Sequence, residues 1–140
     1  MSQENVELVR RRLDAFNRGD LEAMIELTDP DAVWWDRSDD PFGGTPHRGR
    51  DACMQHLAEI LQLAELQVQP QEFIDAGDRV VVGVHLTGRG RTSGVAFKEH
   101  EFHVFTLRGG KVTETREYRD RAEALEAVGL SEQDAHAGSS

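Results

Sequence analysis

The sequence lacks any apolar run long enough to cross a bilayer, and its 140 residues include one cysteine. A membrane-spanning helix needs about 20 consecutive apolar residues, so we expect no membrane partner. The single Cys53 excludes an internal disulfide and a cysteine-cluster metal site. The first residues are polar and read as a helix, without a signal-peptide pattern. These features together favour a cytoplasmic location.

Basic residues are also scarce, since the chain has 16 Lys and Arg but 26 Asp and Glu, for a net charge of −10. Proteins that bind nucleic acid need a basic surface to displace counterions from phosphates, so we expect no nucleic-acid partner. The glycine-rich segment 88–94 lacks the spacing and the lysine of a phosphate loop. There is no G-x-S-x-G elbow and no H-x-x-x-H helix spacing, so we expect neither a serine hydrolase nor a metal site.

Three helices are predicted in the first half of the chain. The first has apolar residues at helical spacing, at Val6, Val9, Leu13 and Phe16. Gly19 suits the position after its end, and Asp20 suits the N-cap of a short second helix. Asp29-Pro30 is predicted to stop that helix, because the residue before a proline is pushed out of the helical region. The third helix begins near Asp51 and runs to about Ala64.

Strands and turns fill most of the remaining sequence. A short aromatic strand is expected at 32–36, followed by a loop at 37–49. Four antiparallel strands are expected after the third helix, at 66–74, 79–88, 95–107 and 112–118. Pro70 cannot donate to a strand ladder, which suggests an edge strand or a bulge. A capping box of Asp120 and Glu123 predicts a last helix through Val128, closed by Gly129.

Helices segregated from antiparallel strands predict an α+β fold. We expect a cone-shaped, curved antiparallel sheet wrapped around the three N-terminal helices, with a short C-terminal helix. Residues 1–130 are expected to form a single domain and 131–140 a disordered tail. The open mouth of such a cone is where a ligand pocket would form.

One predicted strand carries an unusual pair of polar residues. Glu101 and His103 are two residues apart, so they share a face, which Phe105 continues. If that face lines the cone, burial raises the pKa of the carboxylate and the neighbouring carboxylate raises that of the histidine. The pair would then suit general acid–base catalysis near neutral pH. The alternative is that this face meets solvent or a dimer partner, with an ordinary His–Glu pair.

Several segments resemble the SnoaL-like family, which shares the cone-shaped fold of nuclear transport factor 2, ketosteroid isomerase and scytalone dehydratase. They are N-R-G-D-L-E-A-M (17–24), D-P-D-A-V-W-W-D (29–36), R-G-R-D (48–51), F-T-L-R-G-G-K-V (105–112) and E-Y-R-D-R-A-E-A-L-E-A-V-G-L (117–130). The resemblance implies a homodimer and a pocket for a small, partly apolar substrate or ligand, without a cofactor. We expect an acid–base enzyme of the isomerase, cyclase or dehydratase type that acts on an enolisable carbonyl compound, and the alternative is a non-catalytic ligand-binding or dimerisation module of the same fold.

The resemblance also implies roles for individual residues. In the SnoaL-like cyclases a strand histidine faces an acid–base aspartate, and these positions correspond to His103 and Glu117, with Glu101 where a glutamine lies. The general base of ketosteroid isomerase corresponds to Asp36. The tyrosine of that family's oxyanion hole corresponds to Arg12, whose positive charge would bind an anion.

Aromatic residues complete the candidate ligand-binding set. Trp34 and Trp35 must point to opposite faces of their strand, so one is expected in the pocket and the other in packing or against a partner. If the last strand is regular, Tyr118 points to the sheet face opposite to that of Glu117. A bulge would change which of the two faces the pocket. Phe105 and Tyr118 are both ligand-binding candidates.

The remaining histidines have weaker patterns. His56 falls on the apolar face of the third helix, where a packed core or rim histidine is expected. His47 lies in a loop that could cover the mouth of the cone. His100 alternates with His103 and is expected outside the pocket, and the sequence leaves the facing of His85 open.

Overall fold

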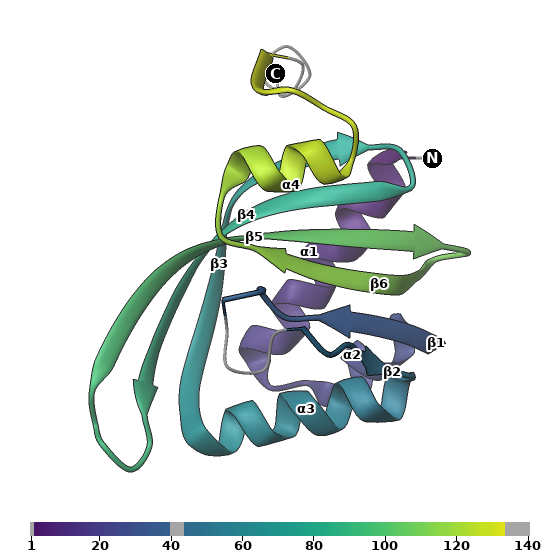
Figure 1. The fold of residues 1–140 in the computed structure, drawn as a ribbon. Helices are drawn as coiled ribbons and strands as arrows, with labels where there is room; N and C mark the ends of the chain where they lie inside the picture. Colours follow the sequence, from purple (N-terminus) through teal and green to yellow (C-terminus); the bar gives the residue numbers. More distant parts are fainter. Residues whose placement is uncertain (1, 40–43, 134–140) are drawn as a thin grey trace.

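The computed structural model describes residues 2–39 and 44–133, which form one curved six-stranded sheet with helices packed on both of its faces (Figure 1). The strand order is β2-β1-β6-β5-β4-β3. Strand β1 (Thr28–Trp35) runs parallel to β6 (Lys111–Tyr118), and the other neighbouring strands pair antiparallel. The predicted α+β cone is therefore confirmed, whereas the parallel pairing of the early strand was not anticipated.

The three N-terminal helices are α1 (Ser2–Arg18), α2 (Leu21–Glu26) and α3 (Arg50–Leu63). Helix α1 buries one apolar side against the sheet, including Val9, which is fully buried. Gly19 follows α1 with a φ of +71°, and the Asp20 carboxylate accepts a hydrogen bond from the backbone N–H of Ala23 at the start of α2. These boundaries agree with the sequence-based prediction.

The end of α2 was predicted wrongly. The helix ends at Glu26, and β1 begins before the proline that was expected to stop the helix. The register between β1 and β6 shifts between Thr28 and Val33. Pro30 lies in this irregular stretch, where its missing N–H removes no regular ladder bond.

The loop predicted at 37–49 contains a two-residue strand, β2 (His47–Arg48), which pairs with β1 through Trp34 and Val33. Residues 40–43 of this predicted loop lie outside the described residues. The short strand matters for the site, because it fixes His47 beside β1.

Three long strands, β3 (Ala64–Ala76), β4 (Arg79–Gly90) and β5 (Ala96–Arg108), form the rest of the sheet with β6. Strands β3 and β4 extend beyond their predicted ranges, whereas β5 is displaced by one residue from its predicted range. Pro70 lies on the edge strand β3, and the register with β4 shifts between Pro70 and Glu72, so both expectations for this proline are confirmed. The start of β3 and the hairpin that joins β4 to β5 bend toward α3 (Figure 1).

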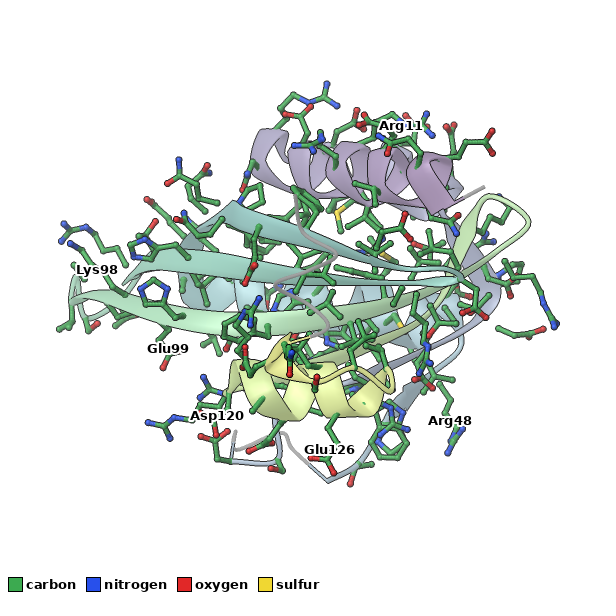
Figure 2. The ribbon with its side chains drawn as sticks, turned by 90° about the horizontal axis from the view of Figure 1, so that it is seen from above. Arg11, Arg48, Lys98, Glu99, Asp120 and Glu126 are labelled. Atoms are coloured by element: carbon green, nitrogen blue, oxygen red, sulfur yellow. The ribbon has the colours of Figure 1, made fainter. Side chains whose placement is uncertain are left out.

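Helix α4 (Arg121–Ala127) covers the outer face, opposite α1 (Figure 2). Its Leu125 packs with Val81 and Val104 of the sheet. Asp120 is the N-cap residue, but its side chain makes no capping hydrogen bond, so the predicted capping box is wrong. Gly129 follows the helix with a φ of +77°, as expected for a helix end. Residues 134–140 lie outside the described residues, so the predicted tail stays a prediction.

Both faces of β5 are therefore covered over much of its length. Phe105 and Leu107 face α1 in one apolar cluster, while Val104 faces α4 in another. This two-sided packing explains why the strand shows no clean alternation of apolar and polar residues.

Among residues 2–39 and 44–133, no helix combines the length and the apolar character that a membrane span requires.

Candidate functional site

A cavity of about 270 Å³ lies between the inner face of the sheet and helices α1, α2 and α3. Most of its wall is apolar, including Phe16, Met24, Leu57, Leu66 and Phe97. Its polar and ionisable lining residues are Arg12, Thr28, Asp36, Cys53, Glu99, Glu101, His103, Thr115 and Glu117. An apolar cavity with a few convergent polar groups is the usual form of a small-molecule site.

His103 and Glu101 project into this cavity from β5 and form a hydrogen-bonded pair. His103 Nε2 lies 3.0 Å from Glu101 Oε1, and Arg37 Nη1 lies 3.1 Å from Glu101 Oε2. Burial alone would lower the pKa of His103, but the hydrogen bond with Glu101 and the charges of Glu117 and Glu101 outweigh it, so its pKa is raised. Burial alone would raise the pKa of Glu101. The hydrogen bond and charge of His103, followed by the charge of Arg37, outweigh burial, so the pKa of this carboxylate is lowered. The pair therefore favours an imidazolium beside a carboxylate.

Glu117 faces the same cavity from β6, directly across from His103 in the strand register. The indole N–H of Trp34 donates a hydrogen bond to Glu117 Oε2 at 2.9 Å. Burial raises the pKa of Glu117 to about 7, although the charge of His103 and the indole donor both act to lower it. At neutral pH this carboxyl group can both give and accept a proton, which is what acid–base catalysis requires.

Asp36, the residue after β1, lies at the cavity wall and is bound by two histidines. The Nε2 atoms of His47 and His56 each lie 3.0 Å from the Asp36 carboxylate. The two imidazole rings stack with centroids 3.7 Å apart and an interplanar angle of 13°. Asp36 and His56 are both buried. The Asp36 carboxylate therefore already has two nitrogen partners.

Sequence reasoning did not connect His47 and His56 with Asp36. They come from β2 and α3, so no short motif holds the three residues together. The prediction that His56 is a packed histidine is confirmed by its burial. Arg37 was missed as well. It is one of the polar residues that follow the aromatic strand, and that pattern is the sequence signal by which it could have been found.

Arg12 enters the cavity from α1. Its Nε donates to Thr28 Oγ1 at 3.4 Å, and its guanidinium carbon lies 5.8 Å from the centre of the Phe105 ring. Burial lowers the pKa of Arg12 to about 10, so the side chain still carries its charge at neutral pH. The cavity therefore contains a permanent positive charge.

Trp35 and Tyr118 do not line this cavity but a second one of about 400 Å³, which also reaches Asp36 and Glu117, so their assignment as ligand-binding residues stays a prediction. Alternation along β1 and β6 turns them to the outer face. There the Arg116 guanidinium lies 4.4 Å from the centre of a Trp35 ring, and Tyr118 packs against the α4 cluster. Trp34 is the tryptophan that lines the cavity. His100 is exposed on the outer face, as expected, and stacks on His85.

Among the residues that the structure describes, two groups of side chains offer possible metal ligands within 4.8 Å of one another: Asp36 with His47 and His56, and Glu101 with His103 and Glu117. A metal ion lies near the plane of each imidazole that binds it, and two stacked rings cannot both meet this condition as placed. The second group would have to give up the hydrogen bond between Glu101 and His103. We therefore assign no metal ligands, and the expectation of a metal-free site stays a prediction.

The family model of the SnoaL-like domain matches residues 9–115, so the chain belongs to this family. A nuclear transport factor 2-like protein from Burkholderia xenovorans is 30% identical with a TM-score of 0.72, covering 91% of this chain and 97% of that one. TerC, co-crystallised with polyporic acid, is 25% identical with a TM-score of 0.73, covering 89% and 98%. A protein of ketosteroid isomerase-like fold from Catenulispora acidiphila, in complex with trimethylamine, is 21% identical with a TM-score of 0.71, covering 89% and 93%. No curated protein is significantly similar in sequence.

Proposed function

We propose that this protein is a cofactor-independent acid–base enzyme of the isomerase or cyclase type, acting on an enolisable carbonyl compound. The observation that carries this proposal is Glu117, which is buried beside His103 in a largely apolar cavity with a pKa of about 7. The binding of polyporic acid by the similar protein TerC supports a small, partly apolar ligand.

In the proposed reaction the ionised Glu117 removes a proton from the carbon next to the carbonyl group. The C–H bond breaks, its electron pair forms a C=C bond, and the carbonyl π electrons move to oxygen. The His103 imidazolium donates a hydrogen bond or a proton to that oxygen. In an isomerisation Glu117 then gives its proton to another carbon of a conjugated dienolate. In a cyclisation the enolate carbon attacks a second carbonyl of the same molecule, and the alkoxide so formed takes the proton from Glu117. In both cases the first carbonyl re-forms, and any proton that His103 gave to its oxygen returns to His103.

The surrounding residues hold these two groups in the required protonation states. Glu101, itself bound by Arg37, stabilises the charged form of His103. Trp34 occupies Glu117 Oε2, so the other oxygen is the one that takes the proton. Asp36 stands second as a candidate base, because His47 and His56 already bind its carboxylate.

The test is exchange of carbon-bound hydrogen for deuterium in heavy water, followed by proton NMR on a panel of aryl ketones and oxo acids. We expect the wild-type protein to accelerate exchange next to the carbonyl group of one or more of them. Glu117→Gln should lower that rate by roughly 100-fold or more, the usual contribution of a general base. His103→Gln should lower the rate while ligand binding is retained.

Glu114→Gln is the matched control, since Glu114 lies on the same strand but outside the cavity lining and pairs with Arg116. It should leave exchange unchanged. If no compound exchanges in the wild type while one binds tightly, the enzyme proposal fails. The non-catalytic ligand-binding module then replaces it.

The homodimer and the cytoplasmic location remain parts of this proposal. The resemblance to the family supports dimerisation, and the single cysteine supports a reducing compartment. Light scattering coupled to size-exclusion chromatography measures the oligomeric state directly, and a monomer would contradict the dimer.

A further inference from the structure

Arg12 brings a guanidinium to the cavity wall without a carboxylate partner among the described residues. Within residues 2–39 and 44–133, its one hydrogen bond runs from Nε to Thr28 Oγ1, at a long 3.4 Å. A guanidinium has five N–H donors, so the two terminal nitrogens retain donors that no described acceptor takes up. A buried cation is costly unless it is paired.

The acidic residues of the same cavity already have partners of their own. Glu101 is bound by Arg37 and His103, and Glu99 lies 3.5 Å from Arg37. Asp36 is bound by its two histidines. None of these carboxylates is within ion-pair distance of Arg12 in the part of the chain that the structure describes.

The position of Arg12 also relates it to the proposed reacting groups. Its guanidinium carbon lies 5.8 Å from the centre of the Phe105 ring, and the His103 ring lies 6.1 Å from the same centre. All three residues line the cavity. Arg12 and His103 therefore both lie close to the Phe105 ring, within reach of one small ligand.

We propose that the cavity binds a partly apolar organic acid whose carboxylate pairs with Arg12 and whose enolisable carbon lies beside His103 and Glu117. The carboxylate matches the fork of guanidinium donors, which bind it through two parallel hydrogen bonds. The apolar walls accept the body of the molecule. The part of this inference that concerns the enolisable carbon rests on the proposed function, whereas the part that concerns the carboxylate does not.

The experiment compares 4-oxo-4-phenylbutanoate with its primary amide, which has nearly the same shape but no charge. Binding is measured by titration calorimetry at neutral pH. We expect the wild type to bind the acid about tenfold more tightly than the amide, or better, since hydrogen bonds to charged groups are the stronger ones. Arg12→Gln should abolish this preference, and Arg12→Lys should restore part of it.

Arg11→Gln is the matched control. Arg11 is the neighbouring residue of α1 and lies on its outer side, away from the sheet (Figure 2). It should keep the preference of the wild type. Circular dichroism and thermal unfolding establish that each variant folds before its binding is compared.

Equal affinity for acid and amide in the wild type, or no binding of either by this or two longer aryl oxo acids, overturns the inference. So does an acid preference that survives in Arg12→Gln. The outcomes also separate the two proposals. An Arg12-dependent preference without deuterium exchange leaves the carboxylate site standing and removes the enzyme. Deuterium exchange of neutral ketones, together with equal affinity for the acid and the amide, leaves the enzyme standing and removes the carboxylate site.

Discussion

Trp34 contacts both Glu117 and His56, and so links the polar group around His103 with the one around Asp36. Its N–H donates to Glu117 Oε2 at 2.9 Å, while its rings lie 4.6 Å from the ring of His56 at a tilt of 60°. His56 in turn binds Asp36. One side chain of β1 thus orients the proposed base and also packs against the buried Asp36–histidine cluster.

Replacing this tryptophan changes the ionisation of Glu117 in a predictable direction. The indole donor stabilises the charged carboxylate, so Trp34→Phe should raise the pKa of Glu117 further above about 7. Carbon-13 NMR titration of labelled glutamate carboxyl groups measures this shift. Trp35→Phe removes the equivalent group on the outer face of the same strand and should leave the Glu117 titration unchanged. An unchanged titration in Trp34→Phe would show that the hydrogen bond does not form in solution.

The fold was largely predictable because its elements carry local patterns. The apolar spacing of α1, the Gly19-Asp20 junction and the interruption at Pro70 each reflect a backbone requirement that a few adjacent residues express. The start of β1 could not be read in this way. Its proline is tolerated only because the pairing with β6 is irregular there, and that pairing joins residues distant in the sequence.

The site was predictable where alternation along one strand decides it. Glu101, His103 and Phe105 share a face by period two, and the structure places all three at the cavity. Contacts between separate elements were not predictable, such as those that bring β2 and α3 to Asp36. The choice between Trp34 and Trp35 also depended on which sheet face the helices cover, which the sequence left open.

The Asp36 cluster should contribute strongly to stability. Leaving a buried hydrogen-bonding group without its partner costs about 1–3 kcal/mol, so His56→Asn should lower the free energy of unfolding by an amount within that range. The side chain of His47 is 23% exposed, so His47→Asn should cost less. Urea unfolding measures both losses. His100→Asn, on an exposed histidine, should stay within about 0.5 kcal/mol of the wild type, and an equally small effect of His56→Asn would contradict a structural role for this cluster.

Asn17 holds the edge strand β3 to the end of α1 and should do so measurably. Its side chain donates to the Val68 carbonyl at 2.7 Å and accepts from the Val68 N–H at 2.8 Å. Asn17→Ala leaves both backbone groups without this partner, which should cost about 1–3 kcal/mol of unfolding free energy. Hydrogen exchange at the Val68 amide should also become faster. Asn5→Ala, which removes one exposed bond to Gly77, is the control and should have a smaller effect.

Glu117 should destabilise the protein at high pH, as the counterpart of its proposed catalytic role. Burial raises its pKa from 4.5 to about 7, so the folded state binds a proton more tightly than the unfolded state does. Stability from this group is fully present below pH 4.5 and is lost as the pH rises through about 7. Each pKa unit corresponds to about 1.4 kcal/mol, so Glu117→Gln should be more stable than the wild type above neutral pH by up to about 3 kcal/mol. Urea unfolding at a series of pH values measures this difference, which should vanish in acid. A constant difference across that range would mean that the pKa of Glu117 is the same in the folded and unfolded states, and the proposed base would lose its physical support.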